Sequence, residues 1–446
     1  MRQIRKFGIL YLSLQLKSNL LKMKNYKHRI ADKLLQKKLE SKGAIVIEGP
    51  KWCGKTTTAE QLAQSVLYMD NPATAKTNLE MAEIDPTVLL LGEVPRLIDE
   101  WQIAPNLWDA IRFETDHRGM VGQFILTGSA VPTEEKRLYH SGTGRYSWLT
   151  MRPMSLWESG ESNGQVSLGN LFHAPEKIAG VSQLTISDIA YLVCRGGWPF
   201  ACNLKGDAAL AQAFDYVDAV IKKDISRVDG TKRSSTTARL LLRSYARNMG
   251  TQASIGTIVA DMAMNNENEI SDKTAGSYLD ALRKIFVIED SEAWNPNLRS
   301  KTAVRTANTR YFVDPSIGTA VLGVGPNDLL NDLKTLGLFF ETMCIRDLRV
   351  FAGALDGEVY HYRDKNGLEC DAVVHLRNGK YGLVEIKLGG EQAIDEGARN
   401  LQKLASIINT EKMNEPSFLM VLVGVGSYAY RRKDGVYVVP IGCLKD

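Results

Sequence analysis

Short apolar runs that alternate with polar turns mark the first third of the chain. Residues 43–48 have the pattern of a buried strand, and residues 56–67 place apolar side chains at helical spacing directly afterwards. Residues 96–100 and 123–129 are two further runs with the length and composition of strands. Strands and helices in this order predict an α/β fold.

The middle of the chain changes to helical periodicity. Residues 159–182 lack periodic apolar positions and predict a loop or an insertion. The helical patterns that follow lie at 186–195, 206–226 and 235–249.

Helical patterns at 255–259 and 272–284, followed by an apolar strand at 285–288, resemble a winged helix-turn-helix. In a DNA-binding version, the helix at 272–284 enters the major groove. Contact with a protein, or a plain connection between domains, is the alternative, since this helix also carries aspartates. Its polar candidates for DNA contact are Lys273, Thr274, Ser277 and Arg283.

The last third of the chain predicts two adjoining strands, at 368–374 and 381–388. The two-residue period of a strand puts Glu385 and Lys387 on one face. Upstream, the helical segment 336–348 carries Glu341 on an apolar stripe, where a carboxylate is costly unless it is paired or bound to a metal.

The segment between the first strand and its helix reads GxxxxGK[ST], and strand, loop and helix in that order is the context this motif requires. The glycines let successive N–H groups turn inward around phosphate. Lys55 brings a positive charge to the terminal phosphates, and Thr56 offers a hydroxyl to Mg²⁺. The sequence therefore predicts that ATP and Mg²⁺ bind here. The predicted nucleotide-binding residues are Gly49, Pro50, Lys51, Trp52, Cys53, Gly54, Lys55, Thr56 and Thr57.

A second strand should deliver an acidic residue to the magnesium ion. Asp99 ends the run at 96–100 and is the predicted metal partner, and Glu100 is placed to polarise the attacking water. The alternative is a surface turn. The next strand presents Thr127 and Ser129, which either sense the γ-phosphate or cap a turn.

Charge is uneven along the 446 residues. The formal net charge is +4, yet the first 40 residues hold eleven Lys and Arg against Asp32 and Glu40. A basic arm favours nucleic acid as a partner, because Lys and Arg release counterions from phosphates. A solvated helix or an unstructured leader is the alternative.

The compartment can also be judged from the sequence. The apolar run after the basic start is short and lacks a small-residue cleavage site, so it is a poor secretory signal, and Met23 is an alternative start. No later stretch reaches the ~20 apolar residues that span a bilayer. The six cysteines form no CxxC pair. We therefore expect a cytoplasmic protein with reduced thiols and no membrane contact.

These segments together resemble a prokaryotic family of AAA-type ATPases that join a P-loop domain to a C-terminal domain of unknown function with a restriction-endonuclease-like core. The resemblance covers nearly the whole chain. In the family pattern, Arg145 follows the sensor strand, which implies contact with the γ-phosphate in cis or from a neighbouring subunit; a surface arginine is the alternative. The markers are 49–56, 97–100, 126–129, 144–145, 196–199, 222–225, 311–314 and 385–387.

An aspartate followed by Glu-x-Lys on the next strand resembles the metal site of restriction-endonuclease-like enzymes. Asp371 and Glu385 are then Mg²⁺ ligands, Glu341 is the third ligand candidate, and Lys387 orients or deprotonates the attacking water. A strict two-residue turn at 378–379 would set Asp371 opposite Ile386 and send Glu385 to the other face. Convergence therefore requires one extra residue in the loop, such as a bulge at Gly379. An ordinary hairpin with solvent-facing charges is the alternative.

The predicted organisation has four parts. We expect an ATPase that acts on or near DNA, with a nuclease-like end whose cleavage activity the sequence leaves open. A nucleotide-switched binding module for DNA or a protein partner is the alternative, and a small-molecule P-loop kinase is the third. We also expect a homo-oligomer without a defined subunit count. The parts are a basic extension at 1–40, a P-loop ATPase domain at 41–160, a helical and winged-helix-like region at 161–300 and a restriction-endonuclease-like domain at 301–446.

Overall fold

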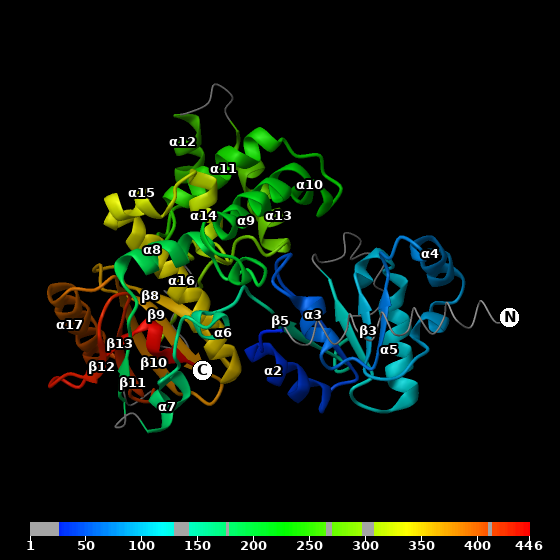
Figure 1. The fold of residues 1–446 in the computed structure, drawn as a ribbon, viewed down its shortest axis with the longest axis horizontal. Helices are drawn as coiled ribbons and strands as arrows, with labels where there is room; N and C mark the ends of the chain where they lie inside the picture. The colour runs from blue at the N-terminus through cyan, green and yellow to red at the C-terminus, as the bar shows by residue number, and fades with distance from the viewer. Residues whose placement is uncertain (1–25, 129–141, 175–177, 265–269, 297–306, 409–412) are drawn as a thin grey trace.

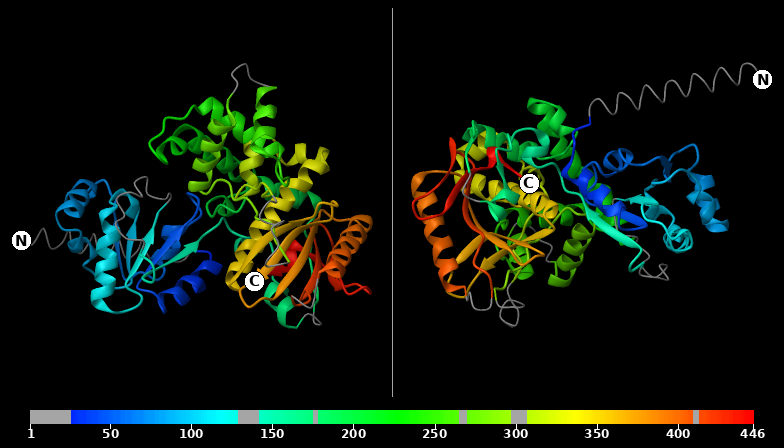
Figure 2. Two further views of the ribbon diagram at one scale, coloured as in Figure 1. Left: turned by 180° about the vertical axis from the view of Figure 1, so that it is seen from behind. Right: turned by 90° about the horizontal axis from the view of Figure 1, so that it is seen from below.

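The structure, a computed structural model, describes residues 26–128, 142–174, 178–264, 270–296, 307–408 and 413–446. Three packed units are visible in Figure 1: a sheet with its helices at the right, a helical unit at the top and a second sheet at the left. Figure 2 shows the same three units from behind and from below. None of the described helices combines the length and apolar character needed to cross a bilayer.

The first unit, the nucleotide unit, is a parallel sheet in the order β2-β3-β4-β1-β5. Helices α2 and α3 pack on one face, and α4, η1 and α5 pack on the other. Its strands are β1 (Ala44–Glu48), β2 (Ser65–Tyr68), β3 (Arg96–Asp99), β4 (Phe124–Thr127) and β5 (Tyr146–Thr150). Its helices are α2 (Ile30–Leu39), α3 (Lys55–Glu60), α4 (Ala75–Ile84), η1 (Pro86–Leu90), η2 (Trp101–Ile103) and α5 (Asn106–Arg118).

Two expectations for this unit are wrong. The helix expected at 56–67 ends at Glu60, and Ser65–Tyr68 is the edge strand β2 beside β3. Val66 and Leu67 face opposite sides of the sheet, and a different layer of helices covers each of them. Consecutive residues of a strand point to opposite faces in this way, whereas a helix would have buried both on one side. From residue 26 onward the expected basic extension is folded, because α2 buries Leu35 completely against the sheet.

The helical unit follows. Helix α14 packs against α8, α9 and α11, so the boundary expected at residue 300 lies too early for it. The strand expected at 285–288 is also wrong. Residue 285 closes α13, Phe286 has a φ of +58°, and only an isolated bridge joins Ile288 to Phe312. The elements are α8 (Ile186–Arg195), η4 (Ala201–Asn203), α9 (Gly206–Ala219), the π-helical turn η5 (Val220–Asp224), α10 (Ile225–Arg227), α11 (Ser235–Arg247), α12 (Ile255–Ala263), α13 (Asp272–Lys284), α14 (Pro315–Leu322) and α15 (Pro326–Asn331).

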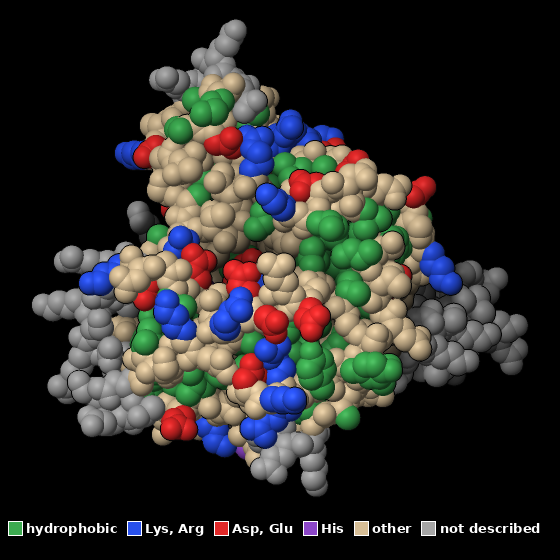
Figure 3. Space-filling model, turned by 90° about the vertical axis from the view of Figure 1, so that its left-hand side faces the viewer, with side chains coloured by type: hydrophobic (Ala, Val, Ile, Leu, Met, Phe, Trp, Pro, Cys, Tyr) green, Lys and Arg blue, Asp and Glu red, His purple; other side chains and the backbone are tan. Residues whose placement is uncertain are grey.

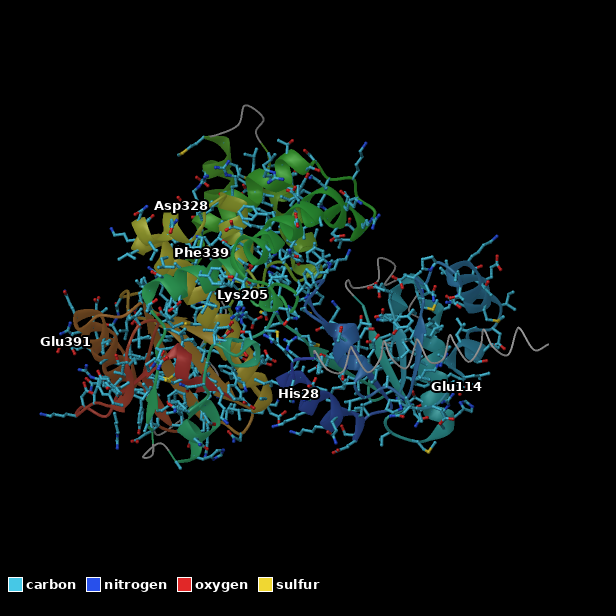
Figure 4. The ribbon with its side chains drawn as sticks, in the orientation of Figure 1. His28, Glu114, Lys205, Asp328, Phe339 and Glu391 are labelled. Atoms are coloured by element: carbon cyan, nitrogen blue, oxygen red, sulfur yellow. The ribbon has the colours of Figure 1, made fainter. Side chains whose placement is uncertain are left out.

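The third unit, the carboxylate unit, is a sheet in the order β7-β12-β13-β11-β10-β9-β8 with α16 on one face and α17 on the other. Phe339 of α16, labelled in Figure 4, lies in the interior against Gly318 of α14. The elements are α6 (Leu156–Ser159), β6 (Val166–Ser167), α7 (Leu168–His173), β7 (Gly180–Val181), α16 (Leu333–Ala354), β8 (Gly357–Arg363), β9 (Glu369–Leu376), β10 (Tyr381–Lys387), α17 (Glu391–Ile407), β11 (Phe418–Val423), β12 (Tyr428–Arg431), β13 (Tyr437–Pro440), η7 (Ile441–Cys443) and β14 (Leu444–Lys445).

The segment expected as a loop at 159–182 belongs to this third unit. Strand β6 pairs with β14, and β7 pairs with β12. Both strands have two residues, too short to leave an alternating pattern in the sequence, so only their distant partners define them.

A buried ion cluster joins the helical and carboxylate units. Arg346 of α16 donates to Asp314 Oδ2 at 2.8 Å and to Asp347 Oδ1 at 2.7 Å, and all three side chains are at most 1 % exposed. The aspartates also accept backbone N–H groups, Gly197 on Asp314 at 3.0 Å and Leu156 on Asp347 at 2.9 Å. Four separate segments of chain therefore meet at one guanidinium group.

We expect Arg346→Ala to lower the free energy of unfolding by about 3–5 kcal/mol, because it leaves two buried aspartates unpaired. Urea unfolding followed by circular dichroism measures the change. The matched control is Lys37→Ala, which removes an exposed ion pair with Asp356 and should cost no more than about 1 kcal/mol. Equal losses in the two variants would contradict this account of the cluster.

Candidate functional site

The phosphate-binding loop lies between β1 and α3. Gly49 has a φ of +143°, and a Cβ there would lie 2.0 Å from the carbonyl oxygen of Met151. Gly54 has a φ of +99° at the start of α3. Lys55 Nζ donates to the carbonyl oxygens of Gly49 and Pro50, each at 2.8 Å. The loop therefore has the backbone path that its glycines predicted, with the lysine ammonium held at its mouth.

Asp99 lies where three parallel strands end side by side. The register places it next to Thr127 of β4, which is next to Ile47 of β1. Its Oδ1 accepts the hydroxyl of Thr56 at 2.8 Å and that of Thr127 at 2.5 Å. Burial raises the pKa of Asp99, although both hydroxyl donors act to lower it. The two residues expected at the magnesium site, Thr56 and Asp99, are therefore brought into direct contact.

Glu100 follows Asp99 in a left-handed conformation, with a φ of +54°. Such a conformation is costly for a non-glycine residue and is concentrated at functional sites. Burial raises the pKa of its carboxyl. Gln102 donates to this carboxylate, and its Oε1 lies 2.2 Å from where a Cβ on Gly128 would be. Sequence reasoning missed Gln102, since nothing in its spacing marks it.

Arg145 lies at the amino ends of the parallel strands, opposite to the carboxyl ends where the phosphate-binding loop lies. The N–H of Ala44, at the start of β1, donates to the Arg145 carbonyl, whereas the phosphate-binding loop follows the end of β1. Its guanidinium pairs with Asp116 at 2.7 Å. Contact with the γ-phosphate in cis is therefore wrong, because the length of a parallel strand separates the two positions. Ser129 lies outside the described residues.

The hairpin of β9 and β10 has the extra residue that convergence requires. Leu376 N donates to Lys380 O at 2.8 Å across a three-residue loop in which Gly379 has a φ of +83°. The pairing of Ala372 with Val384 then sets Asp371 opposite Glu385. The register prediction is confirmed, and both carboxylates project on the same face of the sheet.

Charge is concentrated around these two carboxylates. Lys387 Nζ lies 2.7 Å from Glu385 Oε2 and 3.8 Å from Asp371 Oδ2, and Asp371 Oδ2 accepts Ile386 N at 2.7 Å. Burial lowers the pKa of Lys387, but Asp371 and Glu385 outweigh it and hold that pKa above its usual value. Burial, followed by repulsion from Asp371, raises the pKa of Glu385 to about 8. Glu385 Oε1 is buried and has no hydrogen-bond partner.

Glu341 reaches the same region from α16. Tyr311 donates its hydroxyl to Glu341 Oε1, and burial, followed by repulsion from Asp371, raises the Glu341 pKa to about 8. Among the described residues, however, no group of three or more His, Cys, Asp and Glu side chains is arranged to hold a metal ion. Asp371 and Glu385 are thus brought together, whereas the three-carboxylate ligand set is not assembled.

The DNA-contact candidates on α13 are largely committed to intramolecular bonds. Arg283 pairs with Asp280 at 2.9 Å and with Asp290 at 2.8 Å. Ser277 Oγ accepts from Arg233 at 3.2 Å, and Thr274 contacts the capping Ser271 at 3.0 Å. On the face that carries α15 and α17, basic and acidic side chains are interspersed (Figure 3). The face in Figure 3 presents no basic stripe of the kind that tracks a phosphate backbone.

Comparison with known families places a nucleotide-binding domain at the start of the chain. Residues 41–159 match the family model described as an AAA domain. Residues 186–328 and 336–444 match models described as domains of unknown function, DUF8612 and DUF4143. The first match and the loop geometry identify a P-loop domain of the AAA type. The description of the last model names no activity, so the restriction-endonuclease-like character stays a prediction.

Relatives extend over most of the chain. Uncharacterized proteins of Mycobacterium bovis and Mycobacterium tuberculosis are each 24% identical over 373 residues, which is 82% of this chain and 75% of theirs. Among solved structures, the Walker-type ATPase PABY2304 of Pyrococcus abyssi is 13% identical with a TM-score of 0.41, and covers 65% of this chain and 94% of its own. A STAND protein with a tetratricopeptide repeat sensor from Pyrococcus horikoshii is 14% identical with a TM-score of 0.22, over 71% and 46%.

We expect Glu341→Gln to change how stability depends on pH. A folded pKa of about 8, against a usual 4.5, favours the protonated carboxyl in the folded state. The protonated carboxyl therefore stabilises the folded state fully at pH values below the usual pKa, and this stabilisation is lost as pH rises through about 8. The variant should therefore melt like the parent at low pH and at least about 2 °C higher at alkaline pH.

Thermal melts between acidic and alkaline pH, with a chelator present, test this expectation. The control is Glu391→Gln, at an exposed position at the start of α17 (Figure 4), which should leave the pH dependence of Tm unchanged. A constant difference between Glu341→Gln and the parent across the pH range would contradict it.

Proposed function

We propose that this chain binds ATP with Mg²⁺ and hydrolyses it. The observation that carries the proposal is the contact between Thr56 and Asp99 beside the phosphate-binding loop, at 2.8 Å. A hydroxyl from the first turn of α3 and a carboxylate at the carboxyl end of β3 are the oxygen groups by which P-loop proteins hold magnesium and its water shell. The residues present therefore fit the ion, which would neutralise charge that develops on the phosphates.

Each residue of the loop has a defined task in this proposal. The backbone N–H groups of the loop and the start of α3 bind the phosphate oxygens. Lys55 exchanges its two carbonyl partners for oxygens of the terminal phosphates. Glu100 orients the attacking water, and Gln102 holds the Glu100 carboxylate in place. Thr127 fixes Asp99 from the neighbouring strand, at 2.5 Å.

We expect Lys55→Ala to reduce ATP hydrolysis by at least about a hundredfold, because it removes the charge that stabilises the transferred phosphate. Phosphate release by the purified full-length chain with Mg²⁺ measures the rate. Lys76→Ala, at an exposed lysine of α4, is the control and should keep the parental rate. An unchanged rate in Lys55→Ala would remove the loop from the reaction.

We further propose that the carboxylate unit binds a divalent cation through Asp371 and Glu385 and cleaves a phosphodiester bond of DNA. The unpartnered Oε1 of Glu385 supports this proposal, because a buried carboxylate oxygen without a donor is costly unless a cation completes it. A cation there would polarise the phosphate, and the Lys387 ammonium, which its raised pKa keeps protonated, would orient the attacking water. A recognition module without cleavage is the alternative, favoured by the absence of a three-ligand cluster in the described part of the chain.

Cleavage of supercoiled and linear DNA by the full-length chain, with Mg²⁺ or Mn²⁺ and with or without ATP, separates these two functions. We expect cleavage that disappears in Asp371→Ala, because that change removes one of the two converging carboxylates. The control is Asp395→Ala, at a carboxylate of α17 that pairs with Arg432. Intact ATP hydrolysis without cleavage in any condition would favour the recognition module.

A further inference from the structure

The outer side of the phosphate-binding loop contacts the helical unit. Lys51, in the loop, forms an ion pair with Asp224 at 2.6 Å. Trp52, the next residue, lies 5.9 Å from Tyr216 between ring centroids, at an interplanar angle of 58°. Asp224 ends the π-helical turn η5, and Tyr216 lies about two turns earlier, on α9. Two consecutive loop residues are thus held from outside the nucleotide unit.

Burial and backbone strain set these contacts apart from ordinary surface pairs. The Asp224 side chain is only 11% exposed, whereas that of Lys51 is 41% exposed. Trp52 has a φ of +65°, which turns its ring outward toward Tyr216. A short π-helix within an α-helix is rare and is frequent at functional sites. The π-helical turn ends at the carboxylate that the loop lysine contacts.

Arg29 supports the loop from another side. Its guanidinium donates to the carbonyl of Cys53 at 2.8 Å and to Glu158 at 3.0 Å. The loop is therefore contacted on both flanks of Trp52, and the contacts made by Asp224 and Tyr216 come from the helical unit. Sequence reasoning assigned Asp224 no role.

The contacts continue from Tyr216 into the buried ion cluster. Tyr216 lies 4.3 Å from Trp198 between ring centroids, and Trp198 Nε1 donates to Ser316 Oγ at 2.9 Å. Ser316 Oγ donates to Asp314 Oδ1 at 2.6 Å, and Asp314 pairs with Arg346 of α16. Any displacement of Tyr216 would thus push against buried, close-packed side chains of the helical unit.

We infer that Asp224 is a positioning residue of the ATP site, supplied by the helical unit and acting through Lys51. This inference rests on the ATP binding proposed above. A loop that is already held in its binding conformation loses less conformational entropy when phosphate binds. Neither side chain needs to touch the reacting phosphorus, so the contact should tighten ATP binding without changing the chemical step.

The test compares Asp224→Asn with Asp218→Asn in the full-length chain. Asp218 lies near the end of α9, which leads into η5, and pairs with Lys222 and Arg239 on the surface. Asp224→Asn should raise KM for ATP by about three- to tenfold and leave kcat within about twofold, because one charge-assisted hydrogen bond is lost. Asp218→Asn should leave both constants unchanged. A parental KM in Asp224→Asn would overturn the inference.

A double-mutant cycle shows whether Asp224 acts through Lys51. If it does, Lys51→Met combined with Asp224→Asn should raise KM no further than Lys51→Met alone. If the double variant raised KM by the product of the two single effects, the inference would be overturned. A lower Tm of Asp224→Asn without a change in KM would overturn it as well. Failure of the parent to bind ATP would overturn the proposed function together with this inference. If the parent hydrolyses ATP and Asp224→Asn has the same KM as the parent, only the inference is overturned and the proposed function stands.

Discussion

Arg346 holds a positive charge in the interior of the protein, and the arrangement of the helical and carboxylate units depends on how that charge is neutralised. Its two aspartate partners are Asp314, which caps α14, and Asp347 of α16, and each also accepts a backbone N–H from a segment that precedes the helical unit or lies within it. A charge so deeply buried is tolerated only with complete pairing. The cluster therefore fixes the relative positions of four segments more narrowly than apolar packing alone would.

In both candidate sites, the register of neighbouring strands brings polar side chains together. In the nucleotide unit, parallel register brings Asp99 and Thr127 to the edge where the phosphate-binding loop begins. In the carboxylate unit, a hairpin with one extra loop residue brings Asp371 opposite Glu385. Both sets of carboxyl groups are buried, which raises their pKa values and favours the approach of a cation. A series of contacts leads from the half-exposed Trp52 through the buried Tyr216 to the ion cluster at Arg346.

Local patterns were enough to predict the loop at 49–56, the strand that delivers Asp99 and the extra residue at Gly379. Each depends on residues a few positions apart in the chain. The misassigned elements depend on distant partners instead. Ser65–Tyr68 is a strand because β3 lies beside it, β6 and β7 exist because C-terminal strands pair with them, and Arg145 is misplaced because strand direction decides the edge. Gln102 lies in no motif, and Asp224 lies in the marker at 222–225, whose contact with the loop is visible only in the structure.

Hydrogen exchange of the full-length chain, with and without ATP and Mg²⁺, tests the central claim most directly. ATP should slow the exchange of the backbone amides at 49–56, because phosphate binds them, and of those at 216–224, because Lys51 and Trp52 hold that segment. Unchanged exchange throughout residues 49–56 at saturating ATP would contradict the account.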